Sequence, residues 1–342
     1  MAGMSVSRQV FPILVSSAGR RVELITLLRE DAKRLGLHPR IVATDINPML
    51  APACLVADVS YDVPPAKDKS FIASLCDVCR RESVRLLIPT IDMELQPLAR
   101  NRAALVEQHV FLNISNAASL VVAQDKAKTA RVLSEAGIIV PKTAPIREVI
   151  AEPSSWKWPV FVKPTSGSSS IGVSQAGSVA DLVILEGHRA DLIVQEFIRG
   201  PEFTVNVFVD DSGRCRSIVP HLRREIRGGE VSKAITVKNA VLADIAREIV
   251  KAIPGLFGAI CFQVIVGPDG PAVLEINARF GGGFPVAHRA GARFTQWLIE
   301  LAGGLPSSIS DKWTEGVWML RYDTAAYGVA DTKNEVGQWL AS

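Results

Sequence analysis

The 342-residue sequence has few of the features that mark membrane, secreted or nucleic-acid-binding proteins. No apolar stretch approaches the roughly 18 residues that a membrane-spanning helix needs, and the apolar run near the N-terminus is too short for a signal peptide. No block of basic residues is present, and the net charge is only +3. With 48% hydrophobic and 21% charged residues, the sequence predicts a globular, cytoplasmic protein of two or three domains without nucleic-acid or membrane partners.

Cysteine and histidine are sparse, with five of each in the chain. An odd number of scattered cysteines is typical of reduced thiols in a cytosolic protein. Cys76 and Cys79 form a CxxC pair, but no second pair accompanies them. Packing within a helix is therefore favoured over a redox or metal site for this pair. The histidines show no spacing that is typical of metal ligands.

Two common nucleotide-binding signatures are missing from the chain. The pattern GxxxxGK[ST] does not occur, so a Walker A loop is excluded. The first predicted strand is followed by Ser-Ser-Ala-Gly at 16–19, which lacks the three glycines of dinucleotide-binding folds. An oxidoreductase is therefore poorly supported.

Residues 10–115 show alternating strand and helix patterns. This alternation predicts a parallel sheet with helices on both faces. Because ligands bind beyond the carboxyl ends of such strands, loops 16–20, 45–47 and 90–94 should meet at one edge and border the substrate. The predicted strands are 10–16, 40–44, 85–89 and 110–113, and the predicted helices are 20–35, 71–82 and 101–108.

After residue 115 the pattern changes, and from about residue 157 the strands are expected to pair antiparallel. A helix is expected over 115–137, with Ser115 as its cap and Gly137 as its stop. Another helix is expected over 284–302. The remaining predicted strands are 158–163, 173–175, 192–198, 202–209, 215–219, 258–266 and 272–276, with helices over 179–187 and 240–253.

The most informative segment covers residues 261–283. A Pro-Asp-Gly turn between two apolar runs predicts a β-hairpin. Alternation along its second strand places Glu275 and Asn277 on one face, and Gln263 can lie beside them on the partner strand. One carboxylate and two amide oxygens suit a hard cation such as Mg²⁺. Arg279 falls on the same face one step further on, where its planar guanidinium suits a phosphoryl group.

Three further segments have features of a nucleotide site. Lys163 ends a predicted strand and is followed by a Ser/Gly-rich loop at 165–172, whose backbone N–H groups can approach phosphate oxygens closely. Gln195–Ile198 and Glu202 flank a Gly-Pro turn, where backbone groups can bind an adenine edge and a carboxylate can accept a ribose hydroxyl. Taken alone, the loop and the glutamate are more simply explained as a hairpin connection and a solvated side chain.

Several short motifs follow one another in a fixed order: Asp125-Lys126, Gly137–Pro141, Val162–Pro164, the Ser/Gly loop, Gln195–Phe197, Gly200–Val205, Gln263 and Glu275–Arg279. This order resembles the ATP-grasp superfamily, most closely its carbamoyl-phosphate-synthase-like members, over residues 115–303. The resemblance implies an α/β chain with a Rossmann-like parallel-sheet domain over 1–114. An ATP-grasp fold of two α+β subdomains would follow, with the lid loop in 115–190 and the metal site and tail in 191–342.

The resemblance also implies roles for individual residues. Lys126 and Lys163 would contact the phosphates of ATP, and Lys163 and Arg279 would act catalytically on the transferred phosphoryl group. Glu202 would bind the ribose. Many relatives have Asp where this chain has Gln263, so this site carries one negative charge fewer. The remaining implied roles are the lid (Ser168, Ser169, Ser170), the adenine pocket (Gln195, Glu196, Phe197, Ile198) and the Mg²⁺ or Mn²⁺ site (Gln263, Glu275, Asn277).

The activity implied by the resemblance is ADP-forming ligation. A carboxylate substrate would be phosphorylated by Mg·ATP, and an amine would then attack the acyl phosphate, with water excluded by the lid. The partners would be a small-molecule acid and amine, and relatives of this kind are often homodimers. The alternative is a catalytically silent ATP-binding sensor or interaction module on the same fold. A complete carbamoyl phosphate synthetase and a biotin carboxylase are disfavoured, since the first uses two such units and the second has a large C-terminal domain.

The sequence offers fewer candidates for contacts with the substrates than for contacts with the nucleotide. Arg223 and Arg227 would share a face of a charged strand and would suit an acidic substrate, although a solvated charged strand explains them equally well. Lys238 is a further candidate for the γ-phosphate. His288 follows the glycines at 281–283 and is another candidate for contact with the substrate. A histidine on the surface of the helix explains its position equally well. The identities of the acid and the amine do not follow from the sequence.

Overall fold

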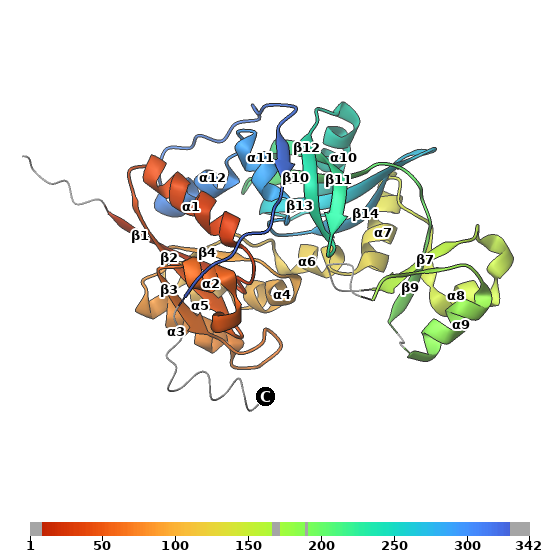
Figure 1. Cartoon of the computed structure of the whole chain (residues 1–342), viewed down its shortest axis with the longest axis horizontal. Helices are drawn as coiled ribbons and strands as arrows, with labels where there is room; N and C mark the ends of the chain where they lie inside the picture. The colour runs from red at the N-terminus through yellow and green to blue at the C-terminus, as the bar shows by residue number, and fades with distance from the viewer. Residues whose placement is uncertain (1–8, 166–171, 189–190, 329–342) are drawn as a thin grey trace, which may run out of the picture.

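The computed structural model describes residues 9–165, 172–188 and 191–328, and their strands form three sheets (Figure 1). The N-terminal residues build a five-stranded sheet, and the C-terminal part builds a six-stranded sheet. A four-stranded sheet with its own helices projects to one side of these two (Figure 1). This division confirms the mixed α/β architecture predicted from the sequence.

The N-terminal sheet is parallel, with strand order β3-β2-β1-β4-β5. Its central strand β1 is buried on both faces, as expected for a parallel sheet. Helix α1 covers one face and α3 the other. The strand order reverses between β1 and β4, so their carboxyl ends border the crevice where ligands bind in such sheets. The elements are β1 (Val10–Ser16), α1 (Val22–Arg34), β2 (His38–Asp45), η1 (Pro48–Leu50), α2 (Pro52–Val56), β3 (Val59–Asp62), α3 (Phe71–Arg81), β4 (Leu86–Pro89), α4 (Asp92–Arg100), α5 (Arg102–Val106) and β5 (Phe111–Leu112).

The six-stranded sheet is antiparallel, with order β14-β13-β10-β11-β12-β15. Along β10, Val205 and Val207 face α10, whereas Phe208 faces α12. Both faces of the sheet are therefore covered by helices. The elements are β10 (Glu202–Val209), β11 (Cys215–Arg227), β12 (Glu230–Thr236), α10 (Ala240–Ala252), β13 (Gly258–Gly267), β14 (Gly270–Asn277), α11 (Phe284–Arg289), α12 (Phe294–Gly303) and β15 (Trp318–Leu320).

These two sheets share their hydrophobic cores. One core joins Leu14 of β1 to Val207 of β10, and the other joins Ile13 of β1 to Phe208 of β10. Leu120 and Leu133 place α6 (Ala117–Ala123) and α7 (Lys126–Glu135) in the first of these cores. The N-terminal sheet and the six-stranded sheet are thus packed as one body.

The four-stranded sheet has a separate core. Its order is β6-β9-β7-β8, with the main apolar contacts from α8 and α9. Because β9 pairs with β6 and β7, we propose that the small subdomain covers about 142–196, whereas α6 and α7 belong to the large body. Its elements are β6 (Thr143–Pro145), α8 (Ile146–Ala151), η2 (Pro153–Ser155), β7 (Val160–Pro164), β8 (Ser174–Ala176), α9 (Val179–His188) and β9 (Leu192–Glu196).

Two helices predicted as continuous are each broken in two. The prediction for 115–137 is wrong at residue 125, where the Asp125 carboxylate accepts the N–H groups of residues 127 and 128 and starts a new helix. Asn116, and not Ser115, caps the first of the two helices. The prediction for 284–302 is wrong after α11, because Gly291 adopts a φ of +112° that a helix does not tolerate.

Cys76 and Cys79 both lie on the buried face of α3 and pack in the core, which confirms the packing interpretation. Burial raises the pKa of Cys79 to about 12, so its thiol is not reactive near neutral pH. Within the described ranges, no three side chains of His, Cys, Asp or Glu come together as a metal site. Over the same ranges, no helix has the length and apolar character needed to cross a membrane.

Candidate functional site

The β13–β14 hairpin brings the predicted metal ligands together. Gln263 and Glu275 lie opposite each other in the register of the two strands. The Asn277 amide donates to Glu275 Oε1 over 3.2 Å, and Arg279 Nη2 donates to Asn277 Oδ1 over 3.0 Å. The predicted face of the hairpin is therefore a continuous row of polar side chains.

Two lysines from other elements approach this row. Lys126 is the first residue of α7, and its Nζ lies 3.9 Å from Glu275 Oε2. Lys163 on β7 donates to the Leu274 carbonyl over 3.5 Å. Burial lowers the pKa of Lys163 to about 8, with a further decrease from the charge of Lys126 and an opposing increase from Glu275. This low pKa means that the neighbouring negative charge does not compensate for the burial of the ammonium group. Such a group is typical of a site where a bound anion supplies the missing charge.

The donor chemistry of the row fits a hard divalent cation. Glu275 supplies a carboxylate, and Gln263 and Asn277 supply amide oxygens, which are ligands that Mg²⁺ accepts when phosphate oxygens complete its shell. The Cys261 thiol lies opposite Asn277 at the end of this row, but burial raises its pKa to about 11 and no imidazole accompanies it, so a zinc site is not indicated. The buried Nε of Arg279 also has no hydrogen-bond partner among the described residues, which leaves one donor for a further anion.

The N-terminal domain contributes Asp92 to this site. Arg279 Nη2 donates to Asp92 Oδ2 over 2.7 Å, and both side chains are largely buried. Burial disfavours the charged guanidinium, but the Asp92 carboxylate outweighs this effect and raises the pKa of Arg279. Asp92 begins α4, directly after β4, so this ion pair joins the edge of the parallel sheet to the hairpin.

The loops at the carboxyl ends of β1, β2 and β4 meet as predicted. The Thr90 hydroxyl donates to the Ser17 carbonyl over 2.5 Å, and the Gly19 N–H donates to Asp45 Oδ2 over 3.0 Å. Glu94 is fully buried there and accepts the Ser16 hydroxyl at 2.6 Å as well as the N–H of residue 90. Burial raises the pKa of Glu94, while these hydrogen bonds oppose the rise. Glu94 therefore holds the loops in place beneath the site.

The predicted adenine segment follows β9. Gln195 is buried, and its amide donates to Thr143 Oγ1 over 2.9 Å. The Glu196 N–H donates to the carbonyl of residue 142, and the Phe197 ring stacks at 6.2 Å from that of residue 161. Ile198 packs on Gly267. The segment thus connects the small sheet to the six-stranded one, and the lid serines 168, 169 and 170 lie outside the described residues.

Glu202 lies close to the metal row and is bonded to Arg223. Burial raises the pKa of Glu202, with Arg223 opposing and Glu275 adding to the rise. The prediction that Arg223 and Arg227 share a face of the strand is wrong, because register shifts after Arg223 interrupt the alternation of β11. Arg227 is exposed and forms an ion pair with Asp323 instead.

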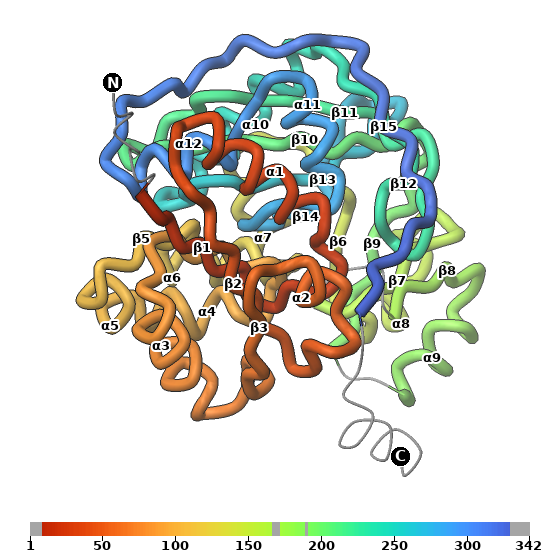
Figure 2. The backbone as a smooth tube through the Cα atoms, turned by 60° about the vertical axis from the view of Figure 1, so that its left-hand side comes forward, coloured from red at the N-terminus to blue at the C-terminus, as the bar shows by residue number. Residues whose placement is uncertain are grey.

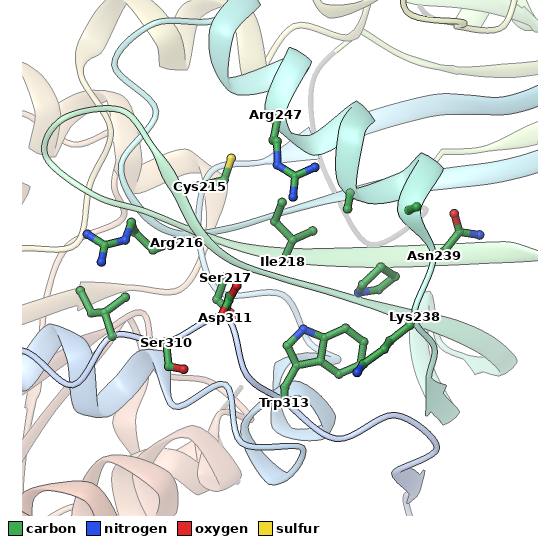
Figure 3. A pocket seen from close by; sticks show the side chains of 14 residues that line it. Cys215, Arg216, Ser217, Ile218, Lys238, Asn239, Arg247, Ser310, Asp311 and Trp313 are labelled. Carbon is green, nitrogen blue, oxygen red and sulfur yellow. The ribbon is translucent and has the colours of Figure 1, made fainter.

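The structure does not bring Lys238 or His288 to this site. Lys238 Nζ lies 5.9 Å from the Trp313 ring centroid, in a separate pocket of about 670 Å³ beside β11 and α10 (Figure 3). His288 is fully buried, and its ring bonds Asp31 of α1 over 2.9 Å. Asp31 also accepts a hydrogen bond from Arg293, so the contacts of Asp31 with His288 and Arg293 hold the C-terminal helices against α1.

Two family models match the chain in succession: the PylC-like N-terminal domain over residues 13–113 and the ATP-grasp domain over residues 123–283. The chain contains an ATP-grasp domain. The predicted family is therefore confirmed, whereas the narrower likeness to carbamoyl phosphate synthetases stays a prediction.

Curated relatives match parts of this ATP-grasp chain. The 3-methyl-D-ornithine–L-lysine ligase of Methanosarcina barkeri is 27% identical over 183 residues, which is 52% of this chain and 46% of that protein. The D-alanine–D-alanine ligase of Stutzerimonas stutzeri is 33% identical over 93 residues, which is 25% of this chain and 30% of that protein. The matched segments thus span less than half the length of these relatives.

Solved structures share the fold over most of the chain. The biotin carboxylase domain dimer of the Hydrogenobacter thermophilus 2-oxoglutarate carboxylase, in complex with MgADP, ADP and bicarbonate, has a TM-score of 0.69 at 18% identity and covers 89% of this chain and 72% of that one. The L-amino acid ligase of Bacillus licheniformis has a TM-score of 0.67 at 17% identity and covers 88% and 76%. At these identities the likeness shows the ATP-grasp fold alone.

Sequence reasoning missed several charged residues around the ATP-grasp site. The sequence did offer an indication of Asp92, since this residue lies in loop 90–94, which was predicted to reach the edge of the parallel sheet. Arg21, Glu230 and Arg321 form a second cluster near Arg279. They come from three distant segments, so no local pattern in the sequence indicates their proximity.

Proposed function

We propose that the protein is an ADP-forming ligase that phosphorylates a carboxylate substrate with ATP and couples the acyl phosphate to an amine. The observation that supports this best is the meeting of Lys126, Lys163, Glu275 and Arg279 from separate elements at the end of β14. The named ligases among the relatives support the same class of reaction.

The lysines and the arginine would neutralise the charge of the reactants. Lys163 is buried with a lowered pKa, so a triphosphate beside it would restore the stability of its charged form. Lys126 would neutralise phosphate charge on the other side of Glu275. Arg279, held by Asp92, would offer its free Nε to the phosphoryl group in transfer.

Glu275, Asn277 and Gln263 would hold Mg²⁺, with Mn²⁺ as a substitute. A cation held by these residues would supply positive charge that offsets the repulsion between the phosphate and the attacking carboxylate. Lys126, which lies beside Glu275, would contact the phosphates in this proposal. Glu202 would accept the ribose hydroxyls, with Arg223 fixing its position.

The remaining parts of the proposal concern the nucleotide and the assembly. Gln195–Ile198 would line the adenine between the two sheets, and the lid with Ser168, Ser169 and Ser170 would exclude water from the acyl phosphate. Two small molecules, an acid and an amine, would be the substrates. A homodimer is proposed by analogy with the biotin carboxylase domain, whose structure is a dimer.

The test is Mg²⁺-dependent release of ADP and phosphate with a panel of carboxylic acids, each offered with and without a panel of amines. Release that requires both an acid and an amine supports the ligase and identifies its substrates. We expect Glu275→Gln to lower that rate by at least about 100-fold, the scale of losing a group that stabilises transition-state charge. Glu248→Gln, on the exposed face of α10, is the matched control and should react as the wild type.

Two outcomes would count against this proposal. A Glu275→Gln variant that releases ADP at the wild-type rate would show that the metal row is assigned wrongly. Tight binding of Mg·ATP without release for any pair would instead support the silent nucleotide-binding module.

A further inference from the structure

Arg21, Glu230 and Arg321 form a charged cluster that the proposed reaction does not yet use. Arg21 directly precedes α1, Glu230 begins β12, and Arg321 follows β15. Pairing of β15 with β12 and the bond from the Arg321 N–H to the Ser232 carbonyl hold the C-terminal segment here. Figure 2 shows this segment passing from β15 along β12 toward the N-terminal sheet.

The Glu230 carboxylate lies closer to Arg321 than to Arg21. Arg321 Nη1 donates to Glu230 Oε2 over 2.9 Å, and Arg321 Nη2 donates to the Gly282 carbonyl. Arg21 Nη1 lies 3.8 Å from Glu230 Oε1, beyond hydrogen-bond distance. Within the described part of the chain, the Arg21 guanidinium makes no hydrogen bond at all. Its side chain is 20% exposed, so its donors remain accessible to water or to a bound ligand.

This cluster adjoins the reaction site through Arg279. Burial lowers the pKa of Arg21, and the charges of Arg279 and Arg321 lower it further, while Glu230 opposes them. Three arginines thus lie close enough to repel one another, and Glu230, Asp92 and Glu275 offset part of this repulsion. An anion bound beside Arg21 would relieve part of this repulsion.

The loop after Arg279 fixes the cluster at this position. A Cβ on Gly282 would lie 3.0 Å from the Glu230 carboxyl carbon, so the loop packs directly on Glu230. Its carbonyl also receives the Arg321 bond. The Gly282 backbone thus contacts the side chains of both Glu230 and Arg321, three residues beyond Arg279.

We propose that Arg21 and Arg321 bind a carboxylate group carried by one of the two substrates, in addition to the carboxylate that is phosphorylated beside Arg279. A planar guanidinium with free donors binds carboxylate in a two-point geometry. The inference rests on the proposed ligase function and narrows its substrates: either the amine is an amino acid, or the acid is a dicarboxylic acid.

The test compares matched compounds in the ADP-release assay. Each amino acid in the panel is paired with the amine that lacks its carboxylate, such as L-alanine with ethylamine. Each dicarboxylic acid is paired with its monocarboxylic counterpart, such as succinate with butyrate. We expect the compound with the additional carboxylate to react faster in only one of the two series, which identifies the substrate that carries it.

The variants are Arg21→Met and Arg321→Met, with Arg34→Met as the matched control. Arg34 is exposed in the last turn of α1. We expect either site variant to raise the KM of the carboxylate-bearing substrate by about 10–100-fold, the scale of a lost charged hydrogen bond. Its kcat should change less, and its affinity for a non-hydrolysable Mg·ATP analogue should stay within about twofold of the wild type.

Thermal shifts by the same compounds, with the Mg·ATP analogue present, provide a readout that needs no turnover. Turnover that depends neither on the additional carboxylate nor on Arg21 would overturn this inference and leave the ligase standing. Stabilisation of the wild type but not of Arg21→Met, without turnover, would support the carboxylate site and refute the reaction. Absence of both binding and turnover would refute both proposals.

Discussion

Replacing Lys163 by methionine should stabilise the ligand-free protein while weakening its binding of ATP. The pKa of Lys163 falls from 10.5 to about 8 because its ammonium is buried with too little negative charge nearby. At about 1.4 kcal/mol per pKa unit, charging this side chain costs the fold about 3 kcal/mol. Methionine has a similar length and no charge, so we expect the variant to gain about 1–3 kcal/mol at pH 7.

The stability that the protein gains from Lys163→Met should decrease as the pH rises. Below pH 8 both the folded and the unfolded protein carry the proton on Lys163, so the cost is complete. Between about pH 8 and 10.5 the unfolded chain binds more protons than the fold, and wild-type stability rises with pH. The advantage of Lys163→Met should therefore roughly halve at pH 9.5.

The assay is urea unfolding in metal-free buffer at pH 7 and pH 9.5, with calorimetry for Mg·ATP. Lys157→Met, an exposed lysine of the same subdomain, is the control and should shift neither the midpoint nor the nucleotide affinity. We expect Lys163→Met to weaken Mg·ATP by at least about 10-fold, since a charged contact is lost. A variant that is less stable than the wild type at pH 7, or that binds Mg·ATP equally well, would refute the reasoning.

Two further predictions concern residues that position the site. Asp31→Asn should destabilise the protein by about 3–5 kcal/mol in urea unfolding, because it leaves the charge of Arg293 without its buried carboxylate; a loss under about 1 kcal/mol would contradict the structural role given to this cluster. Gly200→Ala should lower the thermal midpoint and the nucleotide affinity, because its Cβ would lie 2.0 Å from the Val266 carbonyl oxygen. Gly187→Ala, with no atom within 4 Å of its Cβ, is the control, and equal behaviour of the two alanine variants would show that the turn tolerates a side chain.

Local patterns in the sequence determined the hairpin and most of the parallel sheet. Alternation with period two decides on its own which side chains share a face of a strand. Glu275 and Asn277 were therefore placed correctly, and the turn at the hairpin end brought Gln263 opposite. The loops after β1, β2 and β4 were predicted to meet because parallel strands end at one edge.

Local patterns failed where a single side chain or a distant strand decides the outcome. The Asp125 cap interrupts a segment that is apolar enough to continue as one helix. β12 and β15 were not predicted, since β15 is only three residues long and forms by pairing with β12. His288 was predicted at the site, but the buried carboxylate of Asp31 on α1 holds it elsewhere.

The sequence by itself thus determined the type of domain and the row of oxygen ligands, because both depend on short-range alternation and on the order of motifs along the chain. Only the tertiary structure decided which charges surround that row. Asp92 reaches Arg279 across two sheets that share two hydrophobic cores. Arg21 and Arg321 meet at Glu230 from opposite ends of the chain. Their proximity results from burying common hydrophobic surface, a long-range effect that leaves no periodic signal in the sequence.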